Sequence, residues 1–310
     1  IRMQKKQTIA EAEVEKEKLN VDMYALNDRV NDLYFGILLL DEQIKQNTLL
    51  QDELERNYRQ ITAYVENGIA NQADLDAVKV EQLNTKQKRI DLVSSRAAYL
   101  KMLSLLVGEA LSPETVLEKP VPQSMVSAVS EIRRPELALF DAQGAGLQVQ
   151  EKALNVRHLP QFGLFVQGAY GNPGLDMLKN EFSPYYMAGV RLSWNFGSLY
   201  TLKNDRRVIE KKRQQLDNNR DIFLFNTRLE MTQQDQAIHS LEKQMRDDDE
   251  IIRLRTNIRK AAEAKVANGT LTVTEMLREL TNESLARQSK AMHEIQRLMG
   301  IYQLKYTTNY

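Results

Sequence analysis

The amino-acid sequence predicts a mainly α-helical protein, built from two long antiparallel coiled-coil hairpins in an internal repeat and one β-hairpin. Three observations carry this prediction. Apolar residues recur with a seven-residue period, an Asn-Gly pair recurs at a fixed offset, and residues 160–196 alternate with period two. Proline (7) and glycine (13) are few in 310 residues, which favours long uninterrupted helices.

The composition excludes several functional classes. The chain has 42 Lys and Arg against 42 Asp and Glu, so its overall charge gives no sign of nucleic-acid binding. It has no Cys, which removes disulfides, thiolate zinc sites and Cys nucleophiles. The three His (His158, His239 and His293) do not have the spacing of a helical metal site. We therefore expect no metal, no cofactor and no catalytic residue.

The internal repeat aligns residues 1–109 with residues 202–310 without a gap. Asn67-Gly68 then coincides with Asn268-Gly269, and the apolar residues of the two copies share one phase. Examples are the pairs Val30 and Met231, Ile37 and Ile238, Leu40 and Leu241, and Val65 and Val266. Any two coiled coils can be aligned on their heptads, which is the alternative explanation. The shared Asn-Gly pair favours a true repeat.

Residues 1–108 are predicted to form the first helical hairpin. Its first helix has an apolar seam with alternating spacings of four and three, which is typical of a coiled coil: Leu19, Met23, Leu26, Val30, Leu33, Ile37, Leu40 and Ile44. Gly68 is expected to end this helix in the left-handed conformation, and helix resumes near Asn71 or Ala73. Asn47 interrupts the seam. We interpret it as a register-setting core residue, with a pore-lining role as the alternative.

Residues 198–310 repeat this plan as a second hairpin, whose last helix is expected from about Thr274 to Leu304. Between the two hairpins, residues 109–135 hold four of the seven prolines, which predicts a linker or a small irregular domain. Residues 136–158 read as a further helix. No apolar run approaches the ~18 residues of a transmembrane helix.

Residues 159–197 are predicted to form a β-hairpin. In the second strand Val190, Leu192, Trp194 and Phe196 alternate with Arg191, Ser193 and Asn195. In the first strand Phe162, Leu164, Val166 and Tyr170 share one face. Two such strands with aromatic ends are typical of a transmembrane β-barrel. The apolar residues of the second strand would then face lipid, and Arg191, Ser193 and Asn195 would face the lumen. The alternative is a soluble hairpin on the coiled coil, although two strands alone are marginal in water.

The order of these elements resembles the TolC-type outer-membrane efflux protein family over nearly the whole chain. The resemblance rests on Leu159-Pro160 before the first strand, on residues 190–197 at the end of the second, and on the two Asn-Gly turns. It implies a homotrimer in which each protomer gives four strands to one barrel and two helical hairpins to a periplasmic tunnel. Because no strand pair precedes Ile1 as one precedes Leu202, we expect the chain to be an N-terminally truncated piece.

The resemblance also implies where the site residues lie. Asp74 and Glu275 match acids that constrict the tunnel entrance. The family often has a second acid three residues later, where this chain has Arg278, and we hypothesise that Arg278 latches the gate by pairing with Glu275. The alternative is an exposed i, i+3 pair without a role in the gate. The hairpin tips match the place where a periplasmic adaptor docks: Asn67, Gly68, Ile69, Asn268, Gly269 and Thr270.

The function that this resemblance implies is a passive outer-membrane exit duct of a tripartite efflux pump or a type I secretion system. Its helices would lie in the periplasm. Its partners would be two further copies of the chain, a periplasmic adaptor (membrane fusion) protein, an inner-membrane pump and outer-membrane lipid, but not nucleic acid. The rival interpretation is a soluble coiled-coil tether or adaptor without a pore.

Overall fold

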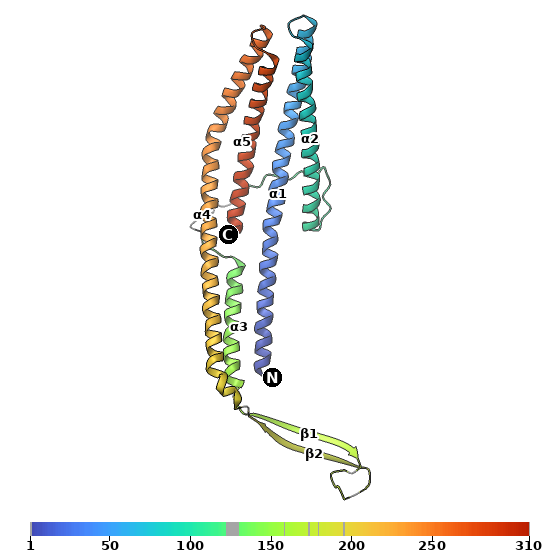
Figure 1. The fold of residues 1–310 in the computed structure, drawn as a ribbon, viewed down its shortest axis with the longest axis vertical. Coiled ribbons are helices and arrows are strands. Elements are labelled where there is room, and N and C mark those ends of the chain that lie inside the picture. The colour runs from blue at the N-terminus through green and yellow to red at the C-terminus, as the bar shows by residue number, and fades with distance from the viewer. Residues whose placement is uncertain are drawn as a thin grey trace. The chain divides into compact units, whose positions relative to one another are not determined.

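The structure is a computed structural model that describes residues 2–121, 130–157, 159–172, 174–178, 180–194 and 196–309 (Figure 1). Its elements are, in chain order, α1 (Arg2–Glu66), α2 (Gln72–Val107), α3 (Pro135–Arg157), β1 (Gln161–Gly171), β2 (Ser183–Ser193), α4 (Gly197–Ala267) and α5 (Val273–Thr308). The predicted fold class, mainly α with one β-hairpin, is confirmed.

The chain divides into two compact units, to which α1 and α4 both contribute. Unit 1 comprises Ile1–Val21 and Pro135–Phe223, and unit 2 comprises Asp22–Arg134 and Leu224–Tyr310. Unit 1 therefore contains the β-hairpin, and unit 2 contains the turns that join α1 to α2 and α4 to α5.

The helix ends follow from local sequence signals. Helix α3 begins at Pro135, one residue before the expected start, because a proline at the first helical position loses no helical hydrogen bond. Helix α5 runs to Thr308, one turn past the expected Leu304, and Asn309 caps it in the left-handed conformation with φ 55°. The side chain of Asn309 also donates to the carbonyl of Arg133 (2.8 Å), which ties the end of α5 to the segment before α3.

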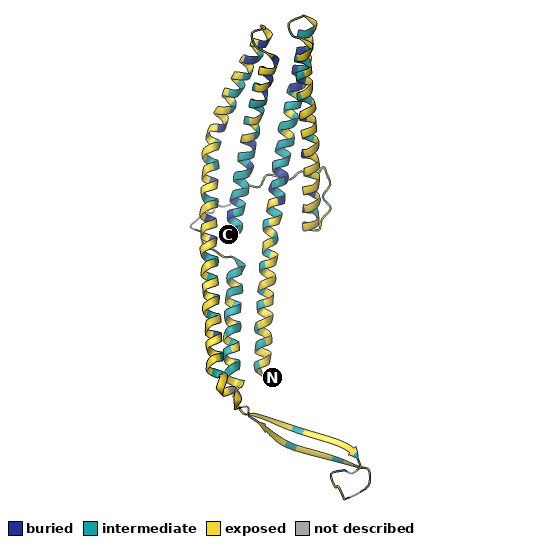
Figure 2. Ribbon diagram, viewed as in Figure 1, coloured by how far each residue is buried: buried dark blue, intermediate teal, exposed yellow. Residues whose placement is uncertain are grey.

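The core of unit 2 next to the turns draws on all four of its helices. One cluster of buried side chains comprises Leu54 and Ile61 of α1, Val78 of α2, Ala262 and Val266 of α4, and Val273, Met276, Leu277 and Leu280 of α5. A second cluster packs Phe35 and Leu38 against Ile295. Figure 2 shows buried residues along both α1 and α5. The two helical hairpins of unit 2 thus share apolar cores.

Residues 109–121, called the strap below, cross unit 2 without forming a helix or strand. Arg96 of α2 forms an ion pair with Asp41 and donates hydrogen bonds to the carbonyls of Pro113 (2.6 Å) and Thr115 (2.7 Å). The Tyr34 hydroxyl donates to the carbonyl of Glu118 (2.6 Å). The predicted linker is therefore fastened to α1 and α2 by its own backbone.

In unit 1, α3 runs antiparallel to α4. Phe140 lies against Phe223 with ring centroids 5.9 Å apart, whereas near the other end of α3 Arg213 pairs with Glu151 (2.7 Å). Arg206 donates to the side chain of Asn155 (2.7 Å), closest to the β-hairpin. These contacts hold the end of α3 beside the start of α4, where the chain enters and leaves the two strands.

Strands β1 and β2 form an antiparallel pair in which Gln161 lies opposite Ser193. The prediction that the second strand continues through Trp194 and Phe196 is wrong, because β2 ends at Ser193 and both aromatic residues lie between it and α4. The reason lies across the pair: Pro160 precedes Gln161 and has no N–H with which to extend the ladder. Asn195 lies outside the described residues.

Candidate functional site

The β-hairpin presents one continuous apolar face. The register pairs Phe162 with Leu192 and Leu164 with Val190, so the apolar residues of both strands point to the same side. This face comprises Phe162, Leu164, Val166, Gly168, Tyr170, Pro184, Tyr186, Ala188, Val190 and Leu192, all of which are exposed (Figure 2). An exposed apolar surface of this extent marks a site of contact with another protein or a membrane.

The opposite face of the hairpin is mixed and partly covered. Arg191 and Ser193 lie on it, as the alternation predicts, and the Arg191 guanidinium lies 5.5 Å from the centroid of the Phe165 ring. The Phe165 ring covers Gly189 so closely that a Cβ there would lie 2.8 Å from it. Every strand residue that is not fully exposed belongs to this face: Phe165, Gly171, Ser183, Tyr185 and Gly189. The two faces therefore differ in chemistry and in exposure.

The two helical tips of unit 2 have the same construction at the offset of 201 residues that the repeat predicts. Gly68 and Gly269 adopt left-handed φ values of 70° and 67°. At the first tip the N–H of Ile69 bonds to the carbonyl of Tyr64 (2.8 Å), and at the second the N–H of Thr270 bonds to that of Lys265 (2.9 Å). These six-residue loops, closed by glycine, are Schellman motifs. Asn67, Ile69 and Asn268, like the glycines and Thr270, are exposed.

Asp74 and Glu275, the predicted gate acids, each form a capping box at the start of a helix. The Asp74 carboxylate accepts from the backbone N–H of Asn71 (3.1 Å), and the Glu275 carboxylate accepts from the N–H of Thr272 (3.2 Å) and its hydroxyl (2.9 Å). The hydrogen bonds from Thr272 hold the pKa of Glu275 below its ordinary value. Both carboxylates thus stabilise α2 and α5 within a single chain.

Arg278 does not pair with Glu275. Its guanidinium lies 3.5 Å from the carboxylate of Glu279, and its side chain is 70% exposed. The predicted pair fails because the capping box turns the Glu275 carboxylate back toward the N-terminus of α5, away from the following turn. Arg278 still lowers the pKa of Glu275, but its effect is smaller than that of Thr272.

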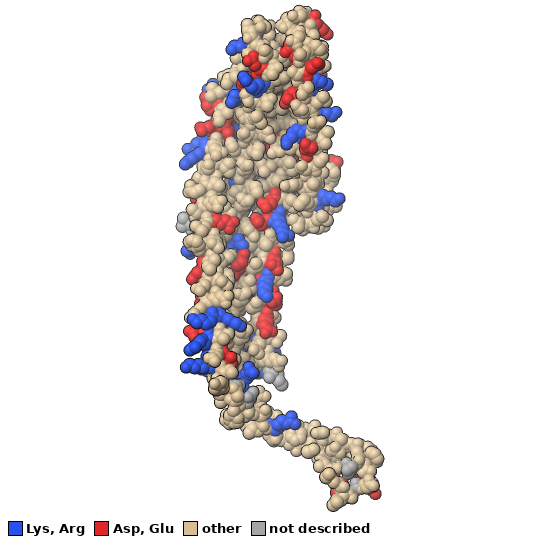
Figure 3. Space-filling view, in the orientation of Figure 1, with Lys and Arg blue, Asp and Glu red and all other residues tan. Residues whose placement is uncertain are grey.

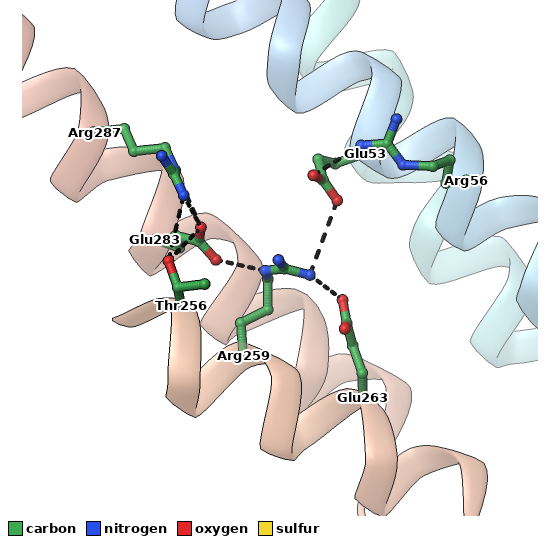
Figure 4. A network of polar contacts seen from close by, with 7 residues as sticks. All are labelled: Glu53, Arg56, Thr256, Arg259, Glu263, Glu283 and Arg287. Atoms are coloured by element: carbon green, nitrogen blue, oxygen red, sulfur yellow. Dashed lines mark hydrogen bonds and ion pairs between the residues drawn. The ribbon is translucent and has the colours of Figure 1, made fainter. Parts of the chain in front are cut away.

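Sequence analysis missed a buried ion-pair network between α4 and α5 (Figure 4). Arg259 pairs with Glu283 and Glu263, and its guanidinium also lies 4.0 Å from Glu53 of α1. Glu283, whose side chain is 6% exposed, also accepts from Arg287 (2.6 Å) and from Thr256 (2.8 Å). The network therefore connects the second helical hairpin to the first.

Hydrogen bonding decides the charge state of this network. Burial raises the pKa of Glu283, but hydrogen bonds from Arg287, Arg259 and Thr256 outweigh that effect, and the net pKa lies below its ordinary value. Burial likewise opposes the charge on Arg259, and its carboxylate partners outweigh it and raise its pKa. Both shifts favour the charged form, so Glu283 and Arg259 form an ion pair at neutral pH.

The heptad pattern does contain a signal for this network. Arg259 continues the seven-residue series of Met231, Ile238, Met245 and Ile252, and Glu283 follows Met276 by seven. The repeat places Tyr58 and Gln82 at the equivalent positions of the first hairpin. At these two positions, therefore, only the second hairpin has charged side chains.

Asn47 forms a hydrogen bond across the first hairpin. Its side-chain N–H donates to the carbonyl of Thr85 (3.1 Å), while its Oδ1 is buried without a partner among the described atoms. The bond joins α1 to α2 at one position along the seam, as a register-setting residue would.

The described part of the chain lacks two kinds of feature. It contains no group of three or more His, Asp or Glu side chains that could hold a metal ion. In the same residues, no helix has an apolar stretch long enough to cross a bilayer.

No family model and no curated protein sequence matches the chain. Several solved structures do. The outer membrane protein VceC of Vibrio cholerae matches with a TM-score of 0.79 at 11% identity, over 99% of this chain and 75% of that one. CusC, whose structures concern folding and transmembrane channel formation, matches with a TM-score of 0.78 at 16% identity, over 99% of this chain and 74% of that one. The MtrE outer membrane channel of Neisseria gonorrhoeae gives 0.75 at 12% identity over 99% and 71%. The chain therefore has the fold of the TolC-type outer-membrane channels.

Proposed function

We propose that the chain forms part of a passive outer-membrane channel, with its helices in the periplasm. The observation that carries this proposal is the β-hairpin face on which ten residues from two paired strands are all exposed. Each strand has 11 residues, and about 9–11 tilted residues cross the hydrocarbon core of a bilayer. Lipid is the environment that such a face requires.

The open edges of the hairpin imply further strands. In a bilayer every backbone N–H and C=O group must be paired, and a two-stranded sheet leaves the outer edge of each strand unpaired. Further strands would close a barrel and remove these edges. This requirement supports assembly of several copies, and the similarity of fold to outer-membrane channels supports a homotrimer.

The channel would act as an exit duct of a tripartite efflux pump or a type I secretion system. A duct without a chemical centre derives its transport energy from elsewhere, which calls for an inner-membrane pump. The two exposed tips of equal construction are suited to dock a periplasmic adaptor, since their backbones are already fixed by Schellman motifs. Crosslinkers placed at Ile69 and Thr270 should capture the adaptor in cells.

Asp74, Glu275 and Arg278 would line the periplasmic entrance in the assembled channel. Carboxylates from several copies, brought together around an axis, repel one another unless cations or basic groups compensate them. Arg278 lies one turn beyond Glu275 and is largely exposed, so it can supply this compensation across the entrance rather than within one helix.

The test of the membrane assignment compares two neighbouring substitutions in the middle of β1. Val166 lies on the apolar face and Gln167 on the opposite face. Val166→Arg should prevent assembly in the outer membrane, because an arginine on the lipid face near the midplane costs about 2–4 kcal/mol. Gln167→Arg adds the same side chain and should assemble. The measurement is the amount of protease-resistant protein in outer-membrane fractions of cells that express the encoded protein.

Two results would contradict this proposal. Equal assembly of both variants would show that the apolar face does not contact lipid, which would favour a coiled-coil tether without a pore. Recovery of the unaltered protein in the soluble fraction would lead to the same conclusion.

A further inference from the structure

Positive charge gathers in unit 1 at the end of the helices next to the β-hairpin. Three segments meet there: residues 2–6 of α1, residues 151–157 of α3 and residues 203–213 of α4 (Figure 1). Together they hold eleven Lys and Arg residues against three Asp and Glu residues, although the whole chain has 42 of each kind. Figure 3 shows the basic side chains side by side where α4 begins. We call these three segments the basic collar.

Much of this charge is uncompensated. Arg213 is paired with Glu151, and Arg206 is bonded to Asn155. Lys203, Arg207 and Lys212, in contrast, have no carboxylate within 4 Å among the described residues, and all three are exposed. The contacts of Arg213 and Arg206 fasten α4 to α3. They therefore fix the backbone that carries the unpaired basic side chains.

Three exposed aromatic residues lie between the hairpin and the basic collar. The Trp194 and Phe196 rings lie 4.4 Å apart between β2 and α4, and Tyr200 in the first turn of α4 is 92% exposed. Along the chain the order is thus an apolar strand, then aromatic rings, then basic side chains. Aromatic residues favour the border between hydrocarbon and headgroups, and lysine and arginine favour anionic headgroups beyond it.

We propose that the basic collar binds the anionic phospholipid headgroups of the membrane leaflet that faces the helices. At ~1.5 Å per residue, Lys203 lies about 9 Å and Arg207 about 15 Å along α4 from its first residue. The long side chains of these residues extend back toward the interface, and attraction to the surface acts over a Debye length of ~8 Å. The inference rests on the proposed channel function, which places the hairpin in the bilayer.

The experiment measures vesicle binding of the purified full chain by flotation. One vesicle type is phosphatidylcholine alone, and the other is an equal mixture of phosphatidylcholine and phosphatidylglycerol. The test variant is Lys203→Gln with Arg207→Gln. The control is Lys243→Gln with Arg246→Gln, which removes the same charge from exposed positions farther along α4. The unaltered chain should prefer phosphatidylglycerol vesicles, and the test variant should lose that preference by about tenfold or more. The control should keep this preference, and high salt should abolish it in both the unaltered chain and the control.

Three outcomes would overturn the proposal: no preference of the unaltered chain for phosphatidylglycerol, equal binding by the test variant, or an equal loss in the control. If an acidic protein rather than lipid occupied the basic collar, the first of these would be observed. The channel function is tested separately by Val166→Arg. If Val166→Arg fails to assemble but phosphatidylglycerol does not increase vesicle binding, only the proposal that the basic collar binds lipid is wrong. If Val166→Arg assembles normally, the channel is wrong whatever the lipid preference.

Discussion

A buried arginine occupies the seam of α4 at a position where its heptad otherwise holds apolar residues. Arg259 is 13% exposed and is compensated by Glu283, Glu263 and, at 4.0 Å, Glu53. Replacing a complete buried ion pair by apolar residues often leaves the free energy of unfolding unchanged. Removing one partner, in contrast, leaves the other charge buried without compensation. We hypothesise that the network gives specificity of packing between the two hairpins more than net stability.

Glu283→Gln should destabilise unit 2 by about 2–3 kcal/mol, at the lower end for a broken buried ion pair because Arg259 keeps Glu263. Hydrogen exchange of the amides in α4 and α5 would measure the loss. The effect should depend on pH with a definite sign. The folded-state pKa of Glu283 is depressed below 4.5, so its contribution is present above that pH and is lost as the pH falls through the folded value. The variant should lack this acid-dependent component, and an identical acid dependence in both proteins would contradict the assignment.

The two tip glycines, like Gly108 at the end of α2, are required for their positive φ rather than for lack of space. A Cβ at Gly68 or Gly269 would meet no atom within 4 Å, so the cost of alanine there arises from the positive φ alone. Gly68→Ala and Gly269→Ala should each destabilise their turn by about 1–2 kcal/mol. Gly146→Ala in α3, which also meets no atom within 4 Å, should stabilise by about 0.5–1 kcal/mol. Chemical denaturation of the three variants provides the comparison, and a stabilising Gly68→Ala would refute the left-handed turn.

At the scale of the elements, the starts of α2 and α5 combine two roles in one residue. Asp74 and Glu275 cap their helices within a single chain, and the channel proposal also places their charges at an entrance. Glutamine can replace glutamate in a capping box, so a neutral amide separates the two roles.

Glu275→Ala should weaken the start of α5 by about 1 kcal/mol, whereas Glu275→Gln should keep most of the cap. Hydrogen exchange at the first turn of α5 would report this difference. Both variants should change ion selectivity in planar bilayers equally, because both remove the charge. If Glu275→Ala changes ion selectivity but Glu275→Gln does not, selectivity depends on the cap and not on the charge. That result would rule out a direct role of Glu275 at the entrance.

The elements also show which features the sequence can predict. The tips were predictable because Asn-Gly, the cap residue and the acid three positions later act through local backbone geometry. The two faces of the hairpin were predictable because side chains alternate with period two in any register that keeps like faces together. The end of β2 was not, since it depends on Pro160, the residue just before the partner strand. The partner of Arg278 was missed because spacing on a helix does not show that a cap has already engaged Glu275.

At the scale of the whole chain, the repeat predicts two equal hairpins, and the structure shows where they differ. Tyr58 and Gln82 of the first hairpin are replaced by Arg259 and Glu283 in the second, so a charged pair is buried in one copy only. Long-range contacts of this kind involve residues that are distant in sequence, and single-helix periodicity does not reveal their partners.

The entrance proposal gives a prediction for the assembled channel. Arg278→Glu adds negative charge near Glu275 and should increase single-channel conductance and cation selectivity in planar bilayers of the encoded protein. Arg228→Glu on α4, exposed and remote in sequence from the tips, is a matched charge reversal that should have little effect. If Arg278→Glu and Glu275→Gln both leave conductance and selectivity unchanged, these residues do not line the entrance.

Two side chains of the helices, Arg96 and Tyr34, bond to carbonyl groups of the strap, and Lys119 of the strap also pairs with Glu42 of α1 (2.9 Å). Arg96→Lys should destabilise unit 2 by about 1–3 kcal/mol, because lysine keeps the charge but cannot reach Asp41 and two carbonyls with one planar fork. Arg89→Lys, which replaces another arginine of α2, serves as the control. Proteolysis within residues 109–121 should become faster in the first variant only.

Three of the bonds that hold the strap are made by its carbonyl groups, and this has a consequence for how the sequence can change. Pro113, Thr115 and Glu118 each contribute a main-chain oxygen, which any amino acid provides. Selection on these bonds therefore acts on Arg96 and Tyr34 rather than on the strap residues that they hold. We therefore expect substitutions to accumulate in the strap at positions whose side chains do not pack. Arg96 and Tyr34, whose side chains bond to the strap, should be retained.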